Sequence, residues 1–335
     1  MLGTGETCWP ALLRRSAWAT LGFLTVLLAC AERTVAPTTG DPLLIAFASN
    51  RISERDSSAG VQVDIYTVTA DGAQVRRVTH SPRSEGSLSW SPDHSRLAYV
   101  QSRPGSLQDS EIHLVNADGT GDVVVRSAPP QGGHYTAVSW SPDGASLAVV
   151  KSHVPGRPGS HIVIWTLDGA SEMHVTDSTV SAGRPAWSPD GSMLAFAGGC
   201  RYCEPQVFGA DLFLIRPDGS DLEQLTFGTE RCDDRGRPTW SPGGSWIAFE
   251  HDSAFTSSIE VLNVNGGSPI TVVECQGQTV CYYPTWSPDG TRLAFIEITR
   301  GHPSIYQILL VNIDGTDPRP LLSGTAQVSS LSWTR

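Results

Sequence analysis

The sequence predicts an all-β fold, namely a single six-bladed β-propeller whose blades are four-stranded antiparallel sheets. Three observations support this: a Trp-Ser-Pro unit repeats along the chain, a hairpin-turn dipeptide recurs once per unit, and the two ends of the repeat region supply complementary parts of one blade. A hydrophobic content of 39% with 33 Gly and 23 Pro is typical of many short strands joined by tight turns.

The repeat is marked by Trp followed by Ser-Pro. Its copies begin at Trp90, Trp140, Trp187, Trp240 and Trp286, and a shortened copy lies at Trp333. The spacing varies between 46 residues (240 to 286) and 53 residues (187 to 240), which is the length of one four-stranded blade. We expect the innermost strand of each blade to end at the Trp. In the turn that follows, as at residues 141–144, Pro fixes φ and Gly adopts positive φ.

Three further strands complete each unit. An apolar strand such as 194–196 follows the Ser-Pro-Asp-Gly turn, and a third strand such as 64–68 comes after a variable loop. A fourth strand, for example 222–226, follows a second tight turn. These second turns are strong hairpin signals, and they are Asp71-Gly72, Asp118-Gly119, Asp168-Gly169, Asp218-Gly219, Asn265-Gly266 and Asp314-Gly315. Six such turns predict six blades.

The ends of the repeat region predict how the ring closes. Residues 43–47 match the second strand of a blade, so the first blade lacks its innermost strand. Residues 330–333 supply an innermost strand that has no blade of its own. Pairing these two segments closes the ring and removes exposed sheet edges.

The repeat units read W-S-P-D-G-x-x-[LI]-A-[FV], and they resemble the WD40-like PD40 repeats of TolB-like propellers over residues 43–335. Two units depart from this pattern, with His94 in place of the turn Gly and Gly243 in place of the Asp. The resemblance implies an envelope protein that binds a partner. TolB-like proteins carry a separate α/β domain before the propeller, whereas only a short tether is expected there in this chain.

The N-terminal segment predicts export and lipid anchoring. Arg14 and Arg15 precede an apolar stretch at residues 17–28, which has the length of a signal-peptide core. Leu27-Leu28-Ala29-Cys30 resembles the bacterial lipobox. We therefore expect a lipoprotein signal peptide at 1–29, a lipidated Cys30 with a polar tether at 30–42, and the propeller at 43–335; Ala31 after the cysteine favours the outer membrane. The alternative is an ordinary cleaved signal with a chance cysteine.

The charge limits the classes of partner. A formal net charge of −11 argues against a sequence-independent nucleic-acid surface, which needs clustered basic residues. We expect a monomer whose contact with the membrane is made by the lipid anchor.

The candidate binding site is the mouth of the central channel. Arg184 and Arg237 each lie three positions before a repeat Trp, in adjacent blades, on the face of the strand that points into the channel. We expect Tyr283 to lie beside them and Tyr135 to lie across the channel. Two guanidinium groups there would receive the carboxylate of an acidic ligand, such as an acidic glycan, or an acidic loop of an envelope protein. The alternative is that each Arg pairs with a local acid and only orders loops. The local acids are Asp177, Asp233 and Asp234.

The remaining cysteines predict disulfides, because the exported protein meets an oxidising compartment. Cys275 and Cys281 share one loop between blades and are expected to pair. Cys232 can reach Cys200 or Cys203, or Cys200 and Cys203 can bridge each other, and one thiol is left over in either case. A zinc site at Cys200, Cys203 and Cys232 with a histidine is the alternative, although we expect no metal.

The sequence predicts a binding module rather than an enzyme. A propeller-type serine peptidase needs a G-x-S-x-G motif in a hydrolase domain, and neither occurs in the chain. A calcium-dependent lactonase needs Glu, Asn and Asp lining the channel, whereas the inner positions of this chain are Ser, Ala, Thr, Arg and Tyr, which argues against that activity. A metal-assisted uronate lyase, as in PD40-containing oligogalacturonate lyases, is the alternative because histidines occur in the predicted loops, at His134, His153, His251 and His302. A purely structural envelope component is a further alternative, and no cofactor is predicted.

Overall fold

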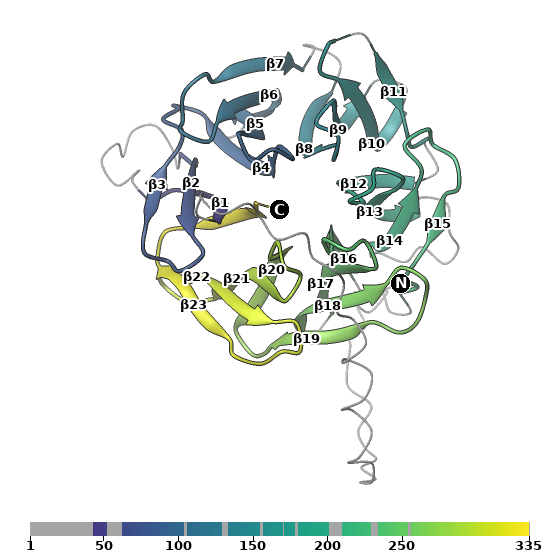
Figure 1. Ribbon diagram of the computed structural model, residues 1–335. Coiled ribbons are helices and arrows are strands. Elements are labelled where there is room, and N and C mark those ends of the chain that lie inside the picture. The colour runs from purple at the N-terminus through teal and green to yellow at the C-terminus, as the bar shows by residue number, and fades with distance from the viewer. Residues whose placement is uncertain are drawn as a thin grey trace, which may run out of the picture. The chain divides into compact units, whose positions relative to one another are not determined.

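The computed structural model describes residues 43–51, 62–103, 106–128, 133–154, 157–169, 171–177, 180–200, 210–228, 234–253 and 256–334. Every described residue belongs to one compact unit, which lies within Thr34–Arg335. The described residues contain strands and no helix, and they form six four-stranded antiparallel sheets around a common centre (Figure 1). The predicted six-bladed propeller is confirmed. No helix in the described ranges is long and apolar enough to cross a membrane.

The first three blades follow one another from the first described strand. Blade 1 consists of β24 (Val328–Trp333), β1 (Leu44–Ser49), β2 (Asp64–Thr69) and β3 (Val75–Arg77). Blade 2 consists of β4 (Ser84–Trp90), β5 (Arg96–Arg103), β6 (Ser106–Asn116) and β7 (Val123–Ser127). Blade 3 consists of β8 (His134–Trp140), β9 (Ser146–Val154), β10 (Arg157–Thr166) and β11 (Glu172–His174).

The other three blades complete the ring. Blade 4 consists of β12 (Val180–Trp187), β13 (Leu194–Cys200), β14 (Asp211–Ile215) and β15 (Glu223–Gln224). Blade 5 consists of β16 (Asp234–Trp240), β17 (Trp246–Asp252), β18 (Ser257–Asn263) and β19 (Ile270–Cys275). Blade 6 consists of β20 (Thr279–Trp286), β21 (Arg292–Thr299), β22 (Ile305–Asn312) and β23 (Arg319–Gly324).

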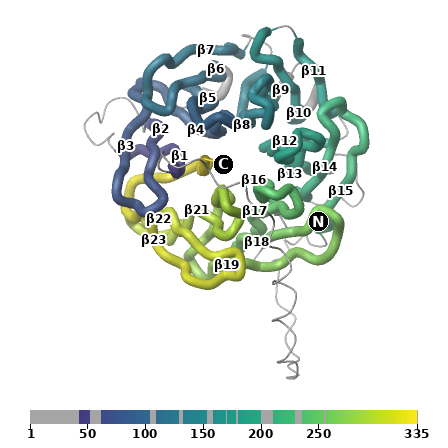
Figure 2. The backbone as a smooth tube through the Cα atoms, viewed as in Figure 1, coloured from purple at the N-terminus to yellow at the C-terminus, as the bar shows by residue number. Residues whose placement is uncertain are grey.

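The ring closes within blade 1. Figure 2 shows the chain passing from blade to blade in sequence order, until the yellow C-terminal strand lies beside the purple first strand. β24 pairs with β1 in antiparallel register, with Ile45 opposite Trp333 and Ser49 opposite Val328. The predicted closure by the C-terminal strand is confirmed.

The Ser-Pro-Asp-Gly turn is held by its own side chains. Ser141 Oγ donates to Asp143 Oδ1 at 2.5 Å, and the backbone N–H of Ala145 donates to the same oxygen at 2.9 Å. Gly144 adopts a φ of 72°, a conformation that is costly for other residues. His94 occupies the equivalent position in blade 2 with a φ of 59°, so the departure from the repeat keeps the same turn geometry.

The hydrophobic core lies between the blades. Buried apolar side chains of the described residues form six clusters, and each cluster joins two neighbouring blades. The repeat tryptophans are part of these clusters, and several reach the backbone of the preceding blade. The indole N–H of Trp240 donates to the Ala186 carbonyl oxygen at 3.0 Å, and that of Trp286 donates to Thr239 at 3.1 Å. The repeated Trp therefore joins blades through both packing and hydrogen bonds.

The tight turns of each blade lie on one rim of the ring. In blade 2 the N–H of Ala117, from the second turn, donates to the carbonyl oxygen of Ser95, from the first turn, at 2.8 Å. In blade 6 Ile313 donates to Thr291 in the same way at 3.0 Å. Because the strands are antiparallel, the longer connections lie on the opposite rim.

Candidate functional site

Every innermost strand contains a bulge close to the channel. In β16 the pairing passes from Gly236 opposite Glu250 to Thr239 opposite Ala248, so two residues of β16 face one residue of β17. The residue three before the Trp lies in this bulge, and in five blades it is a non-glycine residue with positive φ. These residues are Ser87 (51°), Arg184 (48°), Arg237 (49°), Tyr283 (58°) and Ser330 (58°). Such conformations are uncommon outside glycine and concentrate at functional sites.

The bulges surround a cavity of about 350 Å³ that residues of all six innermost strands line. This volume lies within the usual range of small-ligand pockets, about 300–1,000 Å³. Its lining is uneven. Blades 1, 2 and 3 contribute small side chains at the residue before the Trp and two positions earlier, which are Ser330 and Ser332, Ser87 and Ser89, and Ala137 and Ser139. Blades 4, 5 and 6 contribute Arg184, Arg237 and Tyr283.

Arg237 forms an ion pair with Glu250, a residue of β17 that does not line the cavity. The Glu250 side chain is 9% exposed and that of Arg237 is 23% exposed. Glu250 Oε2 also accepts the backbone N–H of Tyr283 at 3.3 Å. One carboxylate therefore holds the bulges of two neighbouring blades. Burial raises the pKa of Glu250, although the Arg237 guanidinium acts in the opposite direction.

Tyr283 brings the two arginines together. The guanidinium carbon of Arg237 lies 4.1 Å from the centre of the Tyr283 ring, and that of Arg184 lies 5.1 Å from it. The Tyr283 hydroxyl is also 3.5 Å from a terminal nitrogen of Arg184. Cation–π contact of this kind orients a guanidinium without neutralising it.

Arg184 differs from Arg237 in its charge partners. No carboxylate oxygen of the described residues lies within 4.0 Å of the Arg184 guanidinium. Among the described residues, Arg184 therefore has no direct ion-pair partner, and it lines the cavity with its positive charge. The arrangement can receive one carboxylate group of a ligand through paired N–H donors.

Tyr135 does not line the channel, and its expected place there is wrong. Its side chain is 4% exposed, and its ring packs edge-on against Trp165 at a centroid distance of 5.1 Å. The reason is the bulge of β8, where Tyr135 pairs with Lys151 and Ala137 pairs with Val150, so one extra residue lies between them. An extra residue reverses the alternation of side chains, and Tyr135 turns into the core between blades 2 and 3.

Of the acids expected to pair with the two arginines, Asp177 does not do so. Arg237 pairs with Glu250 instead, and Asp177 contacts His161 through its backbone carbonyl oxygen at 3.0 Å. Asp234 is the first residue of β16, and Asp233 lies outside the described residues. The sequence alone does not identify Glu250, because it directly follows the apolar triplet at 247–249, where the second strand is expected to end and a loop to begin.

The cysteines are described only in part. Cys275, at the end of β19, and Cys281, in β20, form a disulfide with their Cα atoms 6.0 Å apart. Cys200 is the last residue of β13, and Cys203, Cys232 and the predicted lipidation site Cys30 lie outside the described residues. Their pairing and modification stay predictions.

The histidines considered for a lyase do not form a metal site in the described ranges. His251 contacts Glu260 at 2.9 Å, His134 is buried, and His302 is exposed. His153 lies in β9. Among the described residues, the grouping of His, Cys, Asp or Glu atoms close enough to share an ion is Cys275, Cys281 and Glu297. The disulfide occupies both sulfur atoms of that group.

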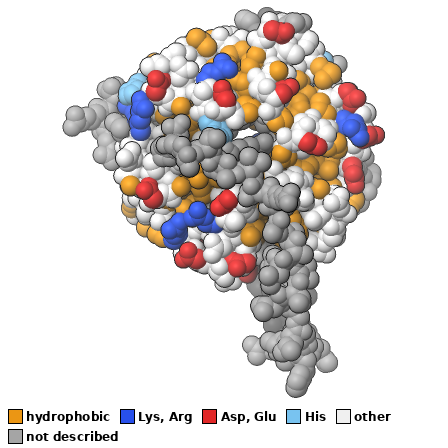
Figure 3. Space-filling view, viewed as in Figure 1, with side chains coloured by type: hydrophobic (Ala, Val, Ile, Leu, Met, Phe, Trp, Pro, Cys, Tyr) orange, Lys and Arg blue, Asp and Glu red, His pale blue; other side chains and the backbone are white. Residues whose placement is uncertain are grey.

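Charged side chains of both signs occur on the face of the ring shown in Figure 3. On the face shown in Figure 3, acidic side chains are spread around the ring and basic side chains occur in small separate groups. No continuous basic stripe runs across the described part of this face.

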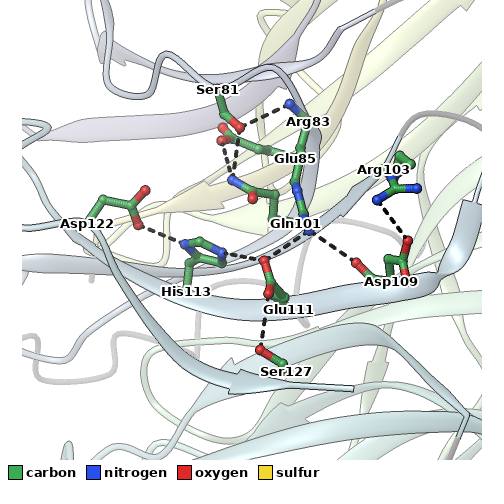
Figure 4. A network of polar contacts seen from close by, with 10 residues as sticks. All are labelled: Ser81, Arg83, Glu85, Gln101, Arg103, Asp109, Glu111, His113, Asp122 and Ser127. Carbon is green, nitrogen blue, oxygen red and sulfur yellow. Dashed lines mark hydrogen bonds and ion pairs between the residues drawn. The ribbon is translucent and has the colours of Figure 1, made fainter. Parts of the chain in front are cut away.

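A second polar network lies at the boundary of blades 1 and 2 (Figure 4). Glu85 is 4% exposed, and it accepts hydrogen bonds from the Thr79 hydroxyl and from Gln101 Nε2, the latter at 3.2 Å. Burial raises the pKa of Glu85 to about 7, and nearby Asp64 adds to this effect. The network binds its own members together, so we assign it to stability rather than to ligand binding.

The network predicts a measurable dependence of stability on pH. The Glu85 carboxyl retains its proton up to about pH 7 in the folded protein, whereas its ordinary pKa is 4.5. The folded state therefore binds more protons in this window, and stability is lost as the pH rises through it. Glu85→Gln removes this loss. The free energy of unfolding of the variant is therefore expected to exceed that of the parent protein by up to about 3 kcal/mol at pH 8 and to match it near pH 4.

Urea unfolding at pH 4 and pH 8 checks this expectation. Glu223→Gln is the matched control, because Glu223 is exposed at the start of β15. The same pH dependence in Glu85→Gln and the parent protein would contradict it.

The described geometry defines a six-bladed propeller whose central channel carries its charged lining side chains, Arg184 and Arg237, on blades 4 and 5. Solved structures with similar folds include TolB from Acinetobacter baumannii, with a TM-score of 0.69 and 21% identity, covering 87% of this chain and 66% of that one. A protein of Agrobacterium tumefaciens assigned as a TolB gives a TM-score of 0.58 at 20% identity, covering 85% of this chain and 90% of that one. An oligogalacturonate lyase in complex with manganese gives a TM-score of 0.51 at 18% identity, covering 85% of this chain and 73% of that one.

These likenesses show a shared fold. The chain spans slightly less than two thirds of the length of the Acinetobacter TolB. Among curated proteins, an uncharacterized protein of Agrobacterium fabrum is 26% identical over 156 residues, which is 44% of this chain and 50% of that protein. The match thus covers half the length of that relative. No protein-family model matches the chain.

Proposed function

We propose that this chain is a non-catalytic binding module of the bacterial cell envelope, and that its channel takes a carboxylate group of a partner protein at Arg184. The observation that carries the proposal is the Arg184 guanidinium, which lines the cavity, is oriented by Tyr283 and forms no ion pair with any of the described residues. Arginine is the residue best suited to bind a carboxylate with two parallel hydrogen bonds.

The surrounding channel supports binding of a polar group. Ser87 and Ser330 line the cavity from the other side of the ring, and their hydroxyl groups are able to hydrogen-bond a ligand. The TolB fold and the lipobox-like segment at Cys30 support an envelope location. In this proposal Cys30 is lipidated and residues 30–42 tether the propeller to the membrane, with the outer membrane favoured.

Crosslinking in intact cells tests the proposal. We expect capture of a specific envelope protein by the parent chain and capture at least about tenfold weaker with Arg184→Gln, because an anchoring arginine contributes about 2 kcal/mol or more at an interface. The melting temperature is expected to stay unchanged, because Arg184 has no ion-pair partner among the described residues.

Arg216→Gln is the matched control for this experiment. Arg216 lies in a tight turn of blade 4, is half-exposed and pairs with the exposed Asp221 at 2.6 Å. Equal capture by Arg184→Gln would place the binding surface elsewhere. Recovery of no specific partner by the parent chain would favour a purely structural envelope component.

A further inference from the structure

We propose that Glu250 determines the charge of the group that the channel accepts, so that the channel binds a single negative charge and discriminates against a double one. The inference rests on the proposed carboxylate-binding function and extends it to the class of ligand. Glu250 acts through Arg237, which makes it a specificity-determining residue that does not line the cavity.

The first step is the enclosure of the Glu250 carboxylate. Oε1 accepts from Arg237, and Oε2 accepts from the backbone of Tyr283. On the β16 side, a Cβ atom at Gly236 would lie 2.8 Å from Oε1, so the backbone packs directly against the carboxylate. Glu250 is therefore fixed in contact with Arg237, and a ligand in the channel does not reach it.

The second step is the charge that remains in the channel. Of the described side chains that line the cavity, the charged ones are Arg184 and Arg237. Glu250 neutralises Arg237, which leaves one positive charge at Arg184. A carboxylate balances this charge. A dianion would leave one negative charge uncompensated in a partly enclosed site, which is unfavourable.

The third step is the repeat itself, which shows that the fold does not need a carboxylate at this position. The residue that follows the apolar triplet of the second strand is apolar in the other five blades, namely Ala48, Val100, Val150, Ala197 and Ile296. Burying a carboxylate in place of an apolar side chain is costly unless it is paired. Arg237 belongs to the same blade as Glu250. In this blade, the ion pair between the two side chains takes the place of the apolar contact that the equivalent residue makes in the other blades.

The experiment compares two ligands that have the same skeleton and differ in charge. Succinate is a dianion at pH 7.5, and monomethyl succinate is a monoanion. We expect the parent protein to bind monomethyl succinate more tightly by isothermal titration calorimetry. In Glu250→Gln, Arg237 is uncompensated, and the ratio of succinate affinity to monoester affinity is expected to rise by at least about tenfold.

A second pair of variants tests the inference by removing Arg237, alone and together with Glu250. Arg237→Gln leaves the Glu250 charge uncompensated, so monoester binding is expected to be lost although Arg184 is intact. In the double variant Arg237→Gln with Glu250→Gln, the net charge returns to one positive, and monoester binding is expected to return. Equal monoester binding in the single and double variants would overturn the proposal.

The controls separate this inference from the function on which it rests. Glu223→Gln, on exposed β15, is expected to leave the affinity ratio unchanged. Monoester binding that depends on Arg184, with an unchanged ratio in Glu250→Gln, would overturn the charge selection alone. Failure of the parent protein to bind either ligand would overturn both the selection and the carboxylate-binding function.

Discussion

Deletion of residues 329–335 is expected to open the ring. The variant is then expected to be no longer stably folded at 25 °C and to show no cooperative unfolding transition. These residues form nearly all of β24, which is the innermost strand of blade 1. Without β24, β1 becomes an exposed sheet edge, and blade 1 loses the innermost strand through which it contacts its neighbours, blades 2 and 6. The cost is expected to reach the total stability of a typical domain, about 5–15 kcal/mol.

The size of this effect follows from the contacts of β24 on both sides. Toward blade 2, the Trp90 indole N–H donates to the Ser332 carbonyl oxygen at 3.1 Å. Toward blade 6, the backbone N–H of Trp333 donates to the Thr285 hydroxyl oxygen at 3.2 Å. Trp333 is 3% exposed and belongs to the apolar cluster between blades 6 and 1. Loss of one buried Trp alone costs about 3–5 kcal/mol.

Thermal unfolding followed by circular dichroism measures the effect. Trp333→Ala keeps the strand and is expected to give an intermediate loss. Val123→Thr is the control, because Val123 lies on the outermost strand β7 with 54% exposure, and it is expected to change stability by less than about 0.5 kcal/mol. Addition of a peptide of residues 328–335 to the deletion variant is expected to restore the transition as its concentration rises. Near-normal melting of the deletion variant would refute closure through β24.

The fold could be predicted because its signals are local. The Ser-Pro-Asp-Gly turn is held by hydrogen bonds among residues 141–146, so six consecutive residues determine the hairpin. Counting back from each Trp also placed Arg184, Arg237 and Tyr283 correctly on the cavity lining. These three residues lie in the bulge itself and still line the cavity, so the count back from the Trp holds as far as the third residue. Closure was predictable for a different reason, since the two ends supplied complementary strands.

The errors at the site come from interactions between strands. Tyr135 lies beyond the bulge of β8, and nothing in the residues next to it announces the extra residue that reverses its direction. Glu250 could have been found by comparing the six repeats, because it is the one acid at a position that is apolar elsewhere. Its partner Arg237 is 13 residues away in the preceding strand, and that pairing becomes visible only when the two strands are set side by side.

The ion pair between Arg237 and Glu250 predicts an asymmetric response to substitution. Arg237→Ser leaves an unpaired carboxylate that is 9% exposed, and the expected loss of stability is about 3–5 kcal/mol. Glu250→Val leaves an unpaired guanidinium that faces the channel, where water hydrates it, so the expected loss is smaller. The double variant reproduces the Ser and Val found at these positions in blade 2, which are Ser87 and Val100, and it is expected to be as stable as the parent protein or more so.

Urea unfolding of the four proteins at pH 8 forms a double-mutant cycle that measures the coupling. The loss in Arg237→Ser is also expected to shrink as the pH is lowered. Burial already raises the pKa of Glu250, and removal of Arg237 takes away the charge that opposes this rise. The folded state then binds the proton more strongly than the unfolded state, so the variant gains stability relative to its value at pH 8 as Glu250 becomes protonated. The opposite result would be additive losses of stability in the double variant and no dependence of the Arg237→Ser loss on pH. The two side chains would then not be coupled, and Arg237 would contribute its charge to the channel independently of Glu250.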